Sequence, residues 1–285
     1  MLSIIKDYFY GQKVALGTKH NKELVIAPLF KSELSMNVVV PPDLDTDKFG
    51  TFTLDHDRPG NQKETSLIKA KAAMELTGLD MGLASEGIFG SHPALPFSIA
   101  NTEVVVFVDR KHDLEIFGGH VEAVNYAQSQ SVESIDEVML FAKRINFPKH
   151  GIVVREAEKK YKSMVKGITN EAELIKVTER LLRKYRKLWI ETDFRAHVNK
   201  SRMNNIAKAT EDLIANIKRL CPKCKTPGFH RVSPKPGLPC ETCGRPTDLP
   251  LYDVYKCDKC NHEQDVKYPN QKHAAYAGYC DYCNP

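Results

Sequence analysis

The cysteines constrain this chain more than any other feature. All eight lie after residue 220, and each belongs to a C-x-x-C pair. Fifteen residues separate the first pair from the second, and nineteen separate the third from the fourth. Both gaps fit the spacing of ribbon-type zinc sites, in which a short hairpin returns the second pair to complete a tetrahedron. The pairs are Cys221 and Cys224, Cys240 and Cys243, Cys257 and Cys260, and Cys280 and Cys283.

We therefore predict two consecutive zinc ribbons, over residues 220–245 and 255–285, each holding one structural Zn²⁺. Four thiolates close the coordination shell and leave no open position for catalysis. The spacing leaves alternatives: interleaved pairing, with the first pair joining the third, a redox role for the C-x-x-C pairs, or a histidine in place of a cysteine. The candidate histidines are His230, His262 and His273.

The remaining composition is that of an ordinary globular protein. Of the 285 residues 42% are hydrophobic and 27% are charged, as is typical of soluble domains. The start of the chain does not have the pattern of a signal peptide, and no run approaches the roughly 18 apolar residues of a membrane span. We expect a cytoplasmic protein that does not associate with membranes, and in that reducing compartment paired thiols more often bind metal than form disulfides.

The net charge argues against a nucleic-acid partner. The formal charge is +5, but eight thiolates on two Zn²⁺ would lower it to about +1. Residues 221–285 carry nine Lys/Arg against seven Asp/Glu before that correction, so the metal-loaded tail is net negative and binds phosphate backbones poorly. Residues 143–187 carry fourteen Lys/Arg against five Asp/Glu, which is more typical of a solvated helix face than of a binding surface.

Residues 1–219 alternate between strand and helix patterns, which predicts an α/β body. The expected strands are 13–17, 36–40, 80–84, 103–108, 114–118 and 152–155. The expected helices are 23–34, 63–77, 133–145, 171–187 and 202–218.

Polar residues follow two of the expected strands, where catalytic groups are often found. The turn after the first strand contains Thr18, Asn21 and Lys22 at the start of a helix, groups able to bind phosphate. A carboxylate and a glycine, Glu86 and Gly87, follow the strand at 80–84. That arrangement can hold Mg²⁺ against phosphate oxygens, although a solvated loop acid is an equally good interpretation.

Two further groups have both a functional and a structural interpretation. Asp45 and Asp47 could bind a hard cation, but a helix cap and turn is the better interpretation. Residues 191–199 carry polar side chains at alternate positions, which would point the same way on a strand and form either a site or an ion-pair network. They are Glu191, Asp193, Arg195, His197 and Asn199.

Short motifs in the body resemble the inosine triphosphate pyrophosphatase superfamily. The segment ETSLIKAKAAMELTGLDMGLASEG resembles its E-N-x-x-x-K-A-x-x-A helix, T-G, strand and acidic turn. VALGTKHNKE is similar to the opening strand and T-G-N-x-x-K turn, NTEVVVFVDRKHDLEIFGG to the long hairpin, and RAHVNKSRMNNIAKATEDL to the closing S-H-R helix. More closely, the whole chain resembles a bacterial family of unknown function with this body and the same ribbon tail.

The resemblance implies a mixed sheet flanked by helices, with a nucleotide-binding cleft in residues 1–219. It also implies Mg²⁺-dependent hydrolysis of a nucleoside triphosphate to the monophosphate and pyrophosphate. Lys22 and Lys69 would neutralise the triphosphate, and Glu64 and Glu86 would hold Mg²⁺. Arg195, His197 and Arg202 would bind the base or the phosphates, so the expected ligand is a nucleotide or another phosphorylated small molecule. The alternative function is a non-enzymatic zinc-ribbon adaptor that binds protein or nucleic acid. The sequence does not indicate an oligomeric state.

Overall fold

The computed structural model describes residues 2–42, 44, 60–95 and 97–285. Asp45 and Asp47 lie outside the described residues. The chain forms two compact units, one of residues 6–214 and one of residues 1–5 with 215–285. Among the described residues, no helix is both long and apolar enough to cross a membrane.

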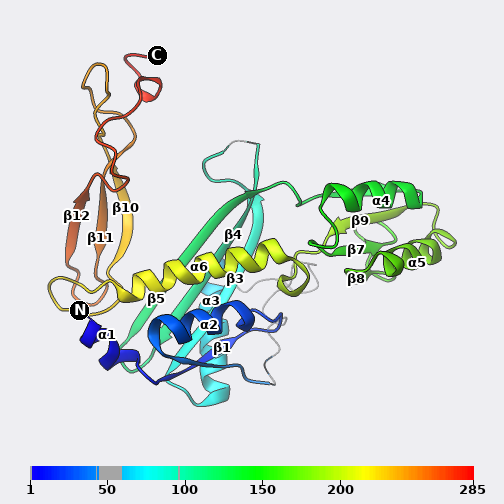
Figure 1. The fold of residues 1–285 in the computed structure, drawn as a ribbon, viewed down its shortest axis with the longest axis horizontal. Helices are drawn as coiled ribbons and strands as arrows, with labels where there is room; N and C mark the ends of the chain where they lie inside the picture. Colours follow the sequence, from blue (N-terminus) through cyan, green and yellow to red (C-terminus); the bar gives the residue numbers. More distant parts are fainter. Residues whose placement is uncertain (1, 43, 45–59, 96) are drawn as a thin grey trace. The chain divides into compact units, whose positions relative to one another are not determined.

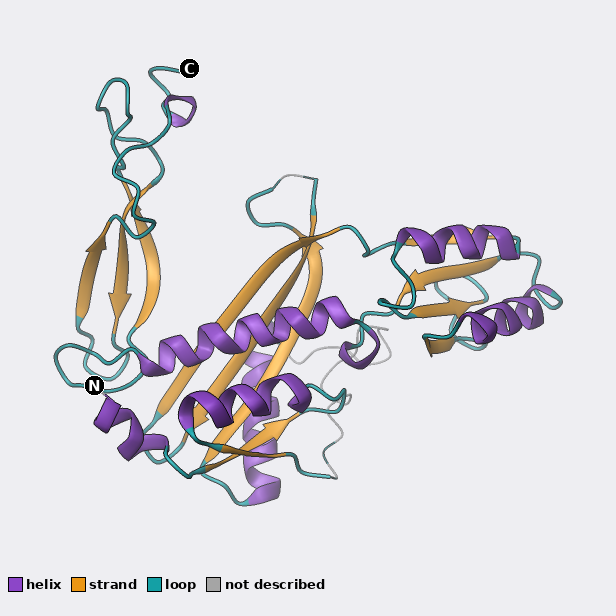
Figure 2. Cartoon of the chain, viewed as in Figure 1, coloured by secondary structure: helices purple, strands orange, loops and turns teal. Residues whose placement is uncertain are grey.

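The larger unit contains two sheets with helices on their faces (Figures 1 and 2). The α/β class predicted from the alternating patterns and the mixed sheet implied by the resemblance are both confirmed. Its helices are α1 (Leu2–Phe9), which begins in the other unit, α2 (Glu23–Leu34), α3 (Gln62–Thr77), α4 (Ile135–Arg144), α5 (Glu171–Leu182) and α6 (Lys200–Lys218), which ends there. Its strands are β1 (Lys13–Gly17), β2 (Asn37–Val39), β3 (Met81–Ser91), β4 (Ile99–Asp109), β5 (Leu114–Val124), β6 (Ser129–Val132), β7 (Ile152–Arg155), β8 (Val165–Ile168) and β9 (Leu188–Thr192).

The first sheet has the order β2-β1-β3-β4-β5. β2, β1 and β3 are parallel, whereas β3, β4 and β5 form a long antiparallel meander. The second sheet has the order β6-β9-β7-β8, and α4 and α5 pack against it around a core that includes Phe141, Ile152 and Leu174.

Helices cover both faces of the first sheet, and glycines in the strands allow α3 and α6 to approach the sheet closely. A Cβ on Gly82 would lie 2.6 Å from Met74 of α3, and a Cβ on Gly118 would lie 2.2 Å from the backbone of Leu213 in α6. Side chains alternate between the faces of a strand. Residues 82, 84 and 86 of β3 therefore face α3, and residues 85 and 87 face α6.

Several helices begin where their capping residues predict. Asn61 accepts from the backbone N–H groups of Lys63 and Glu64, and the Glu64 carboxylate accepts from the Asn61 N–H, which completes a capping box for α3. The side chains of Ser134 and Asn170 cap α4 and α5 by accepting from the backbone N–H groups of Glu137 and Glu173.

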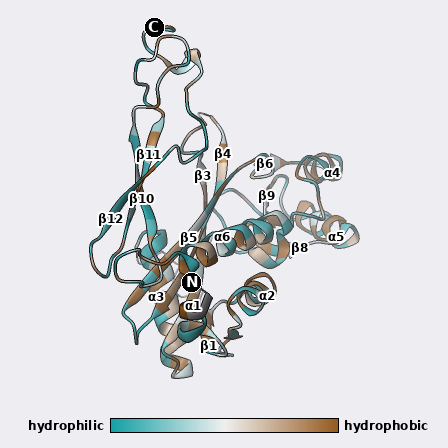
Figure 3. Ribbon diagram, turned by 60° about the vertical axis from the view of Figure 1, so that its left-hand side comes forward, coloured by the Kyte–Doolittle hydropathy of each residue, from teal (hydrophilic) through white to brown (hydrophobic). Residues whose placement is uncertain are grey.

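The smaller unit is built on a three-stranded antiparallel sheet in the order β10-β11-β12. The strands are β10 (His230–Pro236), β11 (Pro250–Lys256) and β12 (Glu263–Lys267). β12 is exposed at every position, and four of its five residues are polar or charged (Figure 3). The apolar cluster at one end of this sheet consists of Phe229 with Cys221 and Cys257, joined by Tyr255 and Cys260. A core this small needs another source of stability.

Candidate functional site

The candidate site of the larger unit lies where β1 ends. β1 pairs with β3 only as far as Gly17, which is opposite Ala84. The next residues of β3, from Ser85 to Gly87, therefore extend past the end of β1, a position where open α/β sheets commonly bind ligands. The expectation of an acidic turn after residue 84 is wrong, because antiparallel pairing with β4 continues β3 to Ser91.

Two of the predicted residues form a buried ion pair on the α3 face. Lys69 Nζ lies 2.7 Å from Glu86 Oε1, and both residues are buried. The helix reaches this position because Gly17 has no side chain: a Cβ there would lie 2.6 Å from the Lys69 carbonyl oxygen. Helix spacing alone does not predict this pair, since it depends on α3 crossing the end of β1.

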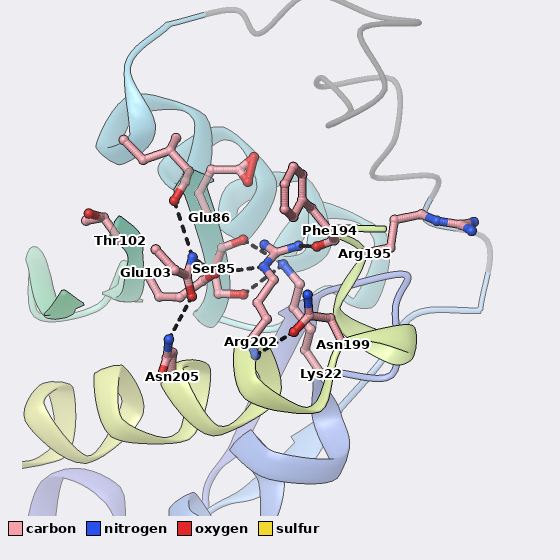
Figure 4. A network of polar contacts seen from close by, with 12 residues as sticks. Lys22, Ser85, Glu86, Thr102, Glu103, Phe194, Arg195, Asn199, Arg202 and Asn205 are labelled. Carbon is pink, nitrogen blue, oxygen red and sulfur yellow. Dashed lines mark hydrogen bonds and ion pairs between the residues drawn. The ribbon is translucent and has the colours of Figure 1, made fainter. Parts of the chain in front are cut away.

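Lys22 enters the site on the α6 face. It occupies the N-cap position of α2, directly after Asn21, whose φ of 57° is left-handed. Its Nζ donates to the Ser85 carbonyl oxygen at 3.2 Å and to Ser85 Oγ at 3.0 Å (Figure 4). Neither acceptor is charged, so these two hydrogen bonds do not give the buried Lys22 an ion-pair partner.

A third buried cation, Arg202, comes from the start of α6. Its Nε donates to Glu103 Oε1 at 2.7 Å, and its Nη1 donates to the Phe194 carbonyl oxygen at 2.7 Å (Figure 4). Asn101 Nδ2 donates to the same Glu103 oxygen at 2.9 Å, and Asn205 Nδ2 donates to Asn101 Oδ1 at 2.9 Å. This network attaches α6 to β4.

The five charges influence one another. Burial lowers the pKa of Lys22 to about 7, with a further lowering from the positive charges of Arg202 and Lys69. Glu86 and Glu103 act in the opposite direction without cancelling that effect. Three buried cations face two buried carboxylates, so the site is one negative charge short of neutrality when every group is ionised.

The other predicted binding residues have different surroundings. Thr18 is buried, and its hydroxyl has no hydrogen-bond partner among the described residues. Asn21 is exposed in the turn, and Glu64 is exposed at the capping box of α3. His197 stacks on His20 with ring centroids 5.0 Å apart, which joins the loop before α6 to the turn after β1.

Residues 191–199 do not form one strand face. β9 ends at Thr192, and the chain then enters a loop and a short 3₁₀ helix, so alternation cannot extend to Asn199. Glu191 instead pairs with Arg155 at 2.7 Å, and Asp193 pairs with Arg195 at 2.7 Å. The ion-pair interpretation fits Glu191, Asp193 and Arg195.

Asn199 is the member of this group that reaches the site. Its Oδ1 accepts from the Arg202 backbone N–H at 3.0 Å, and its Nδ2 donates to the Asp193 carbonyl oxygen at 3.3 Å. It therefore caps the first turn of α6 and orients the segment from which Arg202 projects.

Glu103, Asn101 and Asn205 are not among the site residues predicted from the sequence. One signal was present: Asn101 and Glu103 are polar residues two apart in a strand that is otherwise rich in valine. Side chains two apart share a strand face, so a buried polar pair was indicated. Its partner Arg202 lies 99 residues away and could not be assigned by local spacing.

The described residues of the larger unit offer no ready-made metal site. The groups of three or more cysteine, histidine or carboxylate ligands found among the described residues are both made of cysteines. A magnesium ion in the larger unit would need further oxygen ligands, such as those of a bound phosphate.

The cysteines form two groups of four that could each hold a metal ion. Closest sulfur pairs lie 3.7 and 3.6 Å apart in the first group and 3.9 and 3.7 Å apart in the second. A tetrahedron with Zn–S bonds of 2.3 Å has edges of about 3.8 Å, so the donor sets fit zinc. The first group is Cys221, Cys224, Cys257 and Cys260, and the second is Cys240, Cys243, Cys280 and Cys283.

The predicted sequential pairing is therefore wrong, and the interleaved alternative is correct. Strand direction explains the difference. β11 runs antiparallel to β10, with Lys256 opposite His230, so the pair after β11 returns to the pair before β10. β12 runs antiparallel to β11, so the fourth pair reaches the opposite end and joins the second. The two sites lie at opposite ends of one sheet rather than in two consecutive ribbons.

Each C-x-x-C pair lies in a tight turn suited to holding a thiolate. The residue after the pair donates its backbone N–H to the carbonyl oxygen of the first cysteine in all four turns. In three of them that residue has a φ of 55° to 72°: Lys225, Gly244 and Asn261. Backbone N–H groups of Cys243 and Thr242 lower the pKa of Cys240 to about 7, which favours the anion that binds metal.

One known protein family matches most of this chain. The family model described as "Domain of unknown function (DUF6671)" matches residues 69–285. The chain belongs to this family. The matched segment begins at Lys69 and includes Glu86, Glu103, Arg202 and all eight cysteines. No curated protein and no solved structure matches the chain, so the resemblance to the inosine triphosphate pyrophosphatase superfamily stays a prediction.

Proposed function

We propose that the larger unit binds the phosphate groups of a nucleotide at the end of β1 and hydrolyses it with Mg²⁺, releasing pyrophosphate. The observation that carries the proposal is the buried excess of positive charge formed by Lys22, Lys69 and Arg202 against Glu86 and Glu103. Burying an uncompensated charge is costly, and a bound polyanion removes that cost.

The contacts suggest a role for each group. Among the described residues, the side chain of Lys22 donates to two uncharged oxygens of Ser85, so it can turn to a phosphate without breaking an ion pair. The Thr18 hydroxyl, which lacks a partner among the described residues, can donate to a phosphate oxygen. Lys69 can move from Glu86 to the phosphate, which frees that carboxylate to help hold Mg²⁺. The ion would supply neutralisation of charge on the transferring phosphoryl group.

We propose that the smaller unit binds two Zn²⁺ ions as structural elements. Four thiolates per ion leave no open coordination position. The metal replaces the missing core of a unit whose outer strands, β10 and β12, are largely exposed.

Hydrolysis is tested with the full-length zinc-loaded protein, a panel of nucleoside triphosphates and Mg²⁺, with pyrophosphate release as the readout. Lys69→Met and Glu86→Gln should each lower the rate by at least tenfold. Lys71→Met is the matched control, since Lys71 is on the same helix but forms an exposed pair with Glu115. It should leave the rate unchanged.

The opposite outcome would be inactivity on the whole panel with no nucleotide binding. Tight binding of RNA, DNA or a protein by such an inactive chain would favour the adaptor function. Equal loss of activity in Lys71→Met would show that the effect is one of stability rather than of the site.

A further inference from the structure

One oxygen of Glu103 is buried without a partner beside the proposed phosphate site. Glu103 is fully buried, and Arg202 and Asn101 both bond to its Oε1. Its Oε2 has no hydrogen-bond partner among the residues that the structure describes. Buried polar atoms are nearly always bonded, so an exception calls for an unseen partner.

Glu103 is held close to the sheet surface. It is opposite Gly87 in the β3–β4 ladder, and a Cβ on Gly87 would lie 2.2 Å from Glu103 Oε1. The carboxylate therefore lies over the glycine, on the face from which Lys22 approaches Ser85. Lys22 donates to Ser85, which lies two residues before Gly87 on the same face of β3, so a ligand at Lys22 comes near this carboxylate.

A second unpartnered atom belongs to Tyr126. This residue is buried, stacks on His150 at 3.9 Å between ring centroids and contacts Phe89 edge-on at 6.1 Å. Its hydroxyl has no partner among the described residues. Burial raises the pKa of Tyr126, and the negative charge of Glu103 raises it further, so the hydroxyl keeps its proton.

Glu103 Oε2 and the Tyr126 hydroxyl restrict the chemical group that can bond to both. An ionised carboxylate only accepts hydrogen bonds, whereas a phenol can donate one. A phosphate oxygen cannot satisfy Glu103, because it is an acceptor and an anion. An amino group on a base can donate but accepts poorly. A hydroxyl can donate to Glu103 and accept from Tyr126 at the same time.

We propose that Glu103 and Tyr126 bind a sugar hydroxyl of the phosphorylated ligand, which makes the ligand a ribonucleotide rather than a deoxynucleotide or free polyphosphate. The inference rests on the proposed phosphate site. Glu103 then has two roles: its Oε1 positions Arg202, and its Oε2 accepts a hydrogen bond from the sugar hydroxyl.

The test is a calorimetric comparison of one ribonucleoside triphosphate with its 2′-deoxy and 3′-deoxy forms and with tripolyphosphate. We expect the ribonucleotide to bind about ten- to a hundredfold more tightly than at least one deoxy form, the usual effect of a hydrogen bond to a charged group. Tyr126→Phe removes one hydroxyl without changing shape and should reduce that preference severalfold. Glu103→Gln places an amide donor at the position of Glu103 Oε2 and should abolish the preference for the ribonucleotide.

Two controls separate recognition from stability. Thr178→Val removes another buried hydroxyl without a described partner, from α5. Glu191→Gln breaks another carboxylate–arginine pair with the same 2.7 Å contact, in the second sheet. Both should leave the preference for the ribonucleotide unchanged.

The outcomes distinguish the two proposals. Equal affinity for all four ligands would overturn the sugar contact, as expected if a buried water joins the two atoms, and would leave the phosphate site standing. A preference that follows an amino group on the base, seen by comparing guanine with hypoxanthine nucleotides, would also overturn it. Failure of every ligand to bind would refute the phosphate site itself.

Discussion

The interleaved zinc sites can be tested by counting the zinc retained in paired substitutions. Cys224 and Cys260 belong to one group of sulfurs, whereas Cys224 and Cys243 belong to different groups. Cys224→Ser with Cys260→Ser therefore damages one site, and Cys224→Ser with Cys243→Ser damages both. Sequential ribbons would reverse these two results.

The size of the effect follows from the geometry. Sulfur pairs at 3.6 to 3.9 Å match the edges of a zinc tetrahedron, so each thiolate would supply a full bond to a bound zinc ion. Structural zinc in small modules is bound with about 10–16 kcal/mol. Removing one of four thiolates should weaken a site by several orders of magnitude, enough for a competing chelator to empty it.

The assay is elemental analysis after dialysis against a moderate chelator. We expect two zinc ions in the unaltered protein, one in Cys224→Ser/Cys260→Ser and none in Cys224→Ser/Cys243→Ser. The single Cys224→Ser variant, as a control, should retain one. Loss of both ions from the first double variant, together with one ion kept by the second, would refute the interleaved arrangement and restore sequential ribbons.

Three further predictions concern the charge, the packing and the metal. Because the pKa of Lys22 is about 7 against an ordinary 10.5, anion binding must reprotonate it above pH 7, so sulfate affinity measured by calorimetry should fall by up to tenfold per pH unit from pH 7 to 9. Lys22→Met should bind weakly without that pH dependence, and a steep dependence in this variant would assign the effect to another group. Gly87→Ala should destabilise the protein by about 1–3 kcal/mol in denaturant melts, because its Cβ would meet Glu103, whereas Gly90→Ala has open space and should cost little by comparison. Removing zinc with a strong chelator should abolish hydrogen-exchange protection in residues 221–285 and preserve it in β4; protection that survives in both would contradict the structural role of the metal.

Much of the local structure was predictable from the sequence, because it depends on neighbouring residues. β1, β7 and α2 have the expected bounds, and α3, α4 and α6 differ from theirs by one or two residues. The expected helix at 171–187 ends early, at Leu182, because the following residues lead into β9. β6, β8 and β9 were missed, since their short runs gain stability only from pairing with other strands of the second sheet.

The sequence by itself determined the four thiolate pairs, the helix caps and the lysines at the start of α2 and within α3. Each of these depends on residues a few positions apart, so local spacing is enough to recognise it. Only the tertiary structure decided which thiolates share a site and which carboxylates meet the buried cations. The strands carry the cysteine pairs to opposite ends of a sheet, and α6 brings Arg202 onto Glu103 across 99 residues. Strand direction and helix packing set these long-range contacts, and no local pattern encodes them.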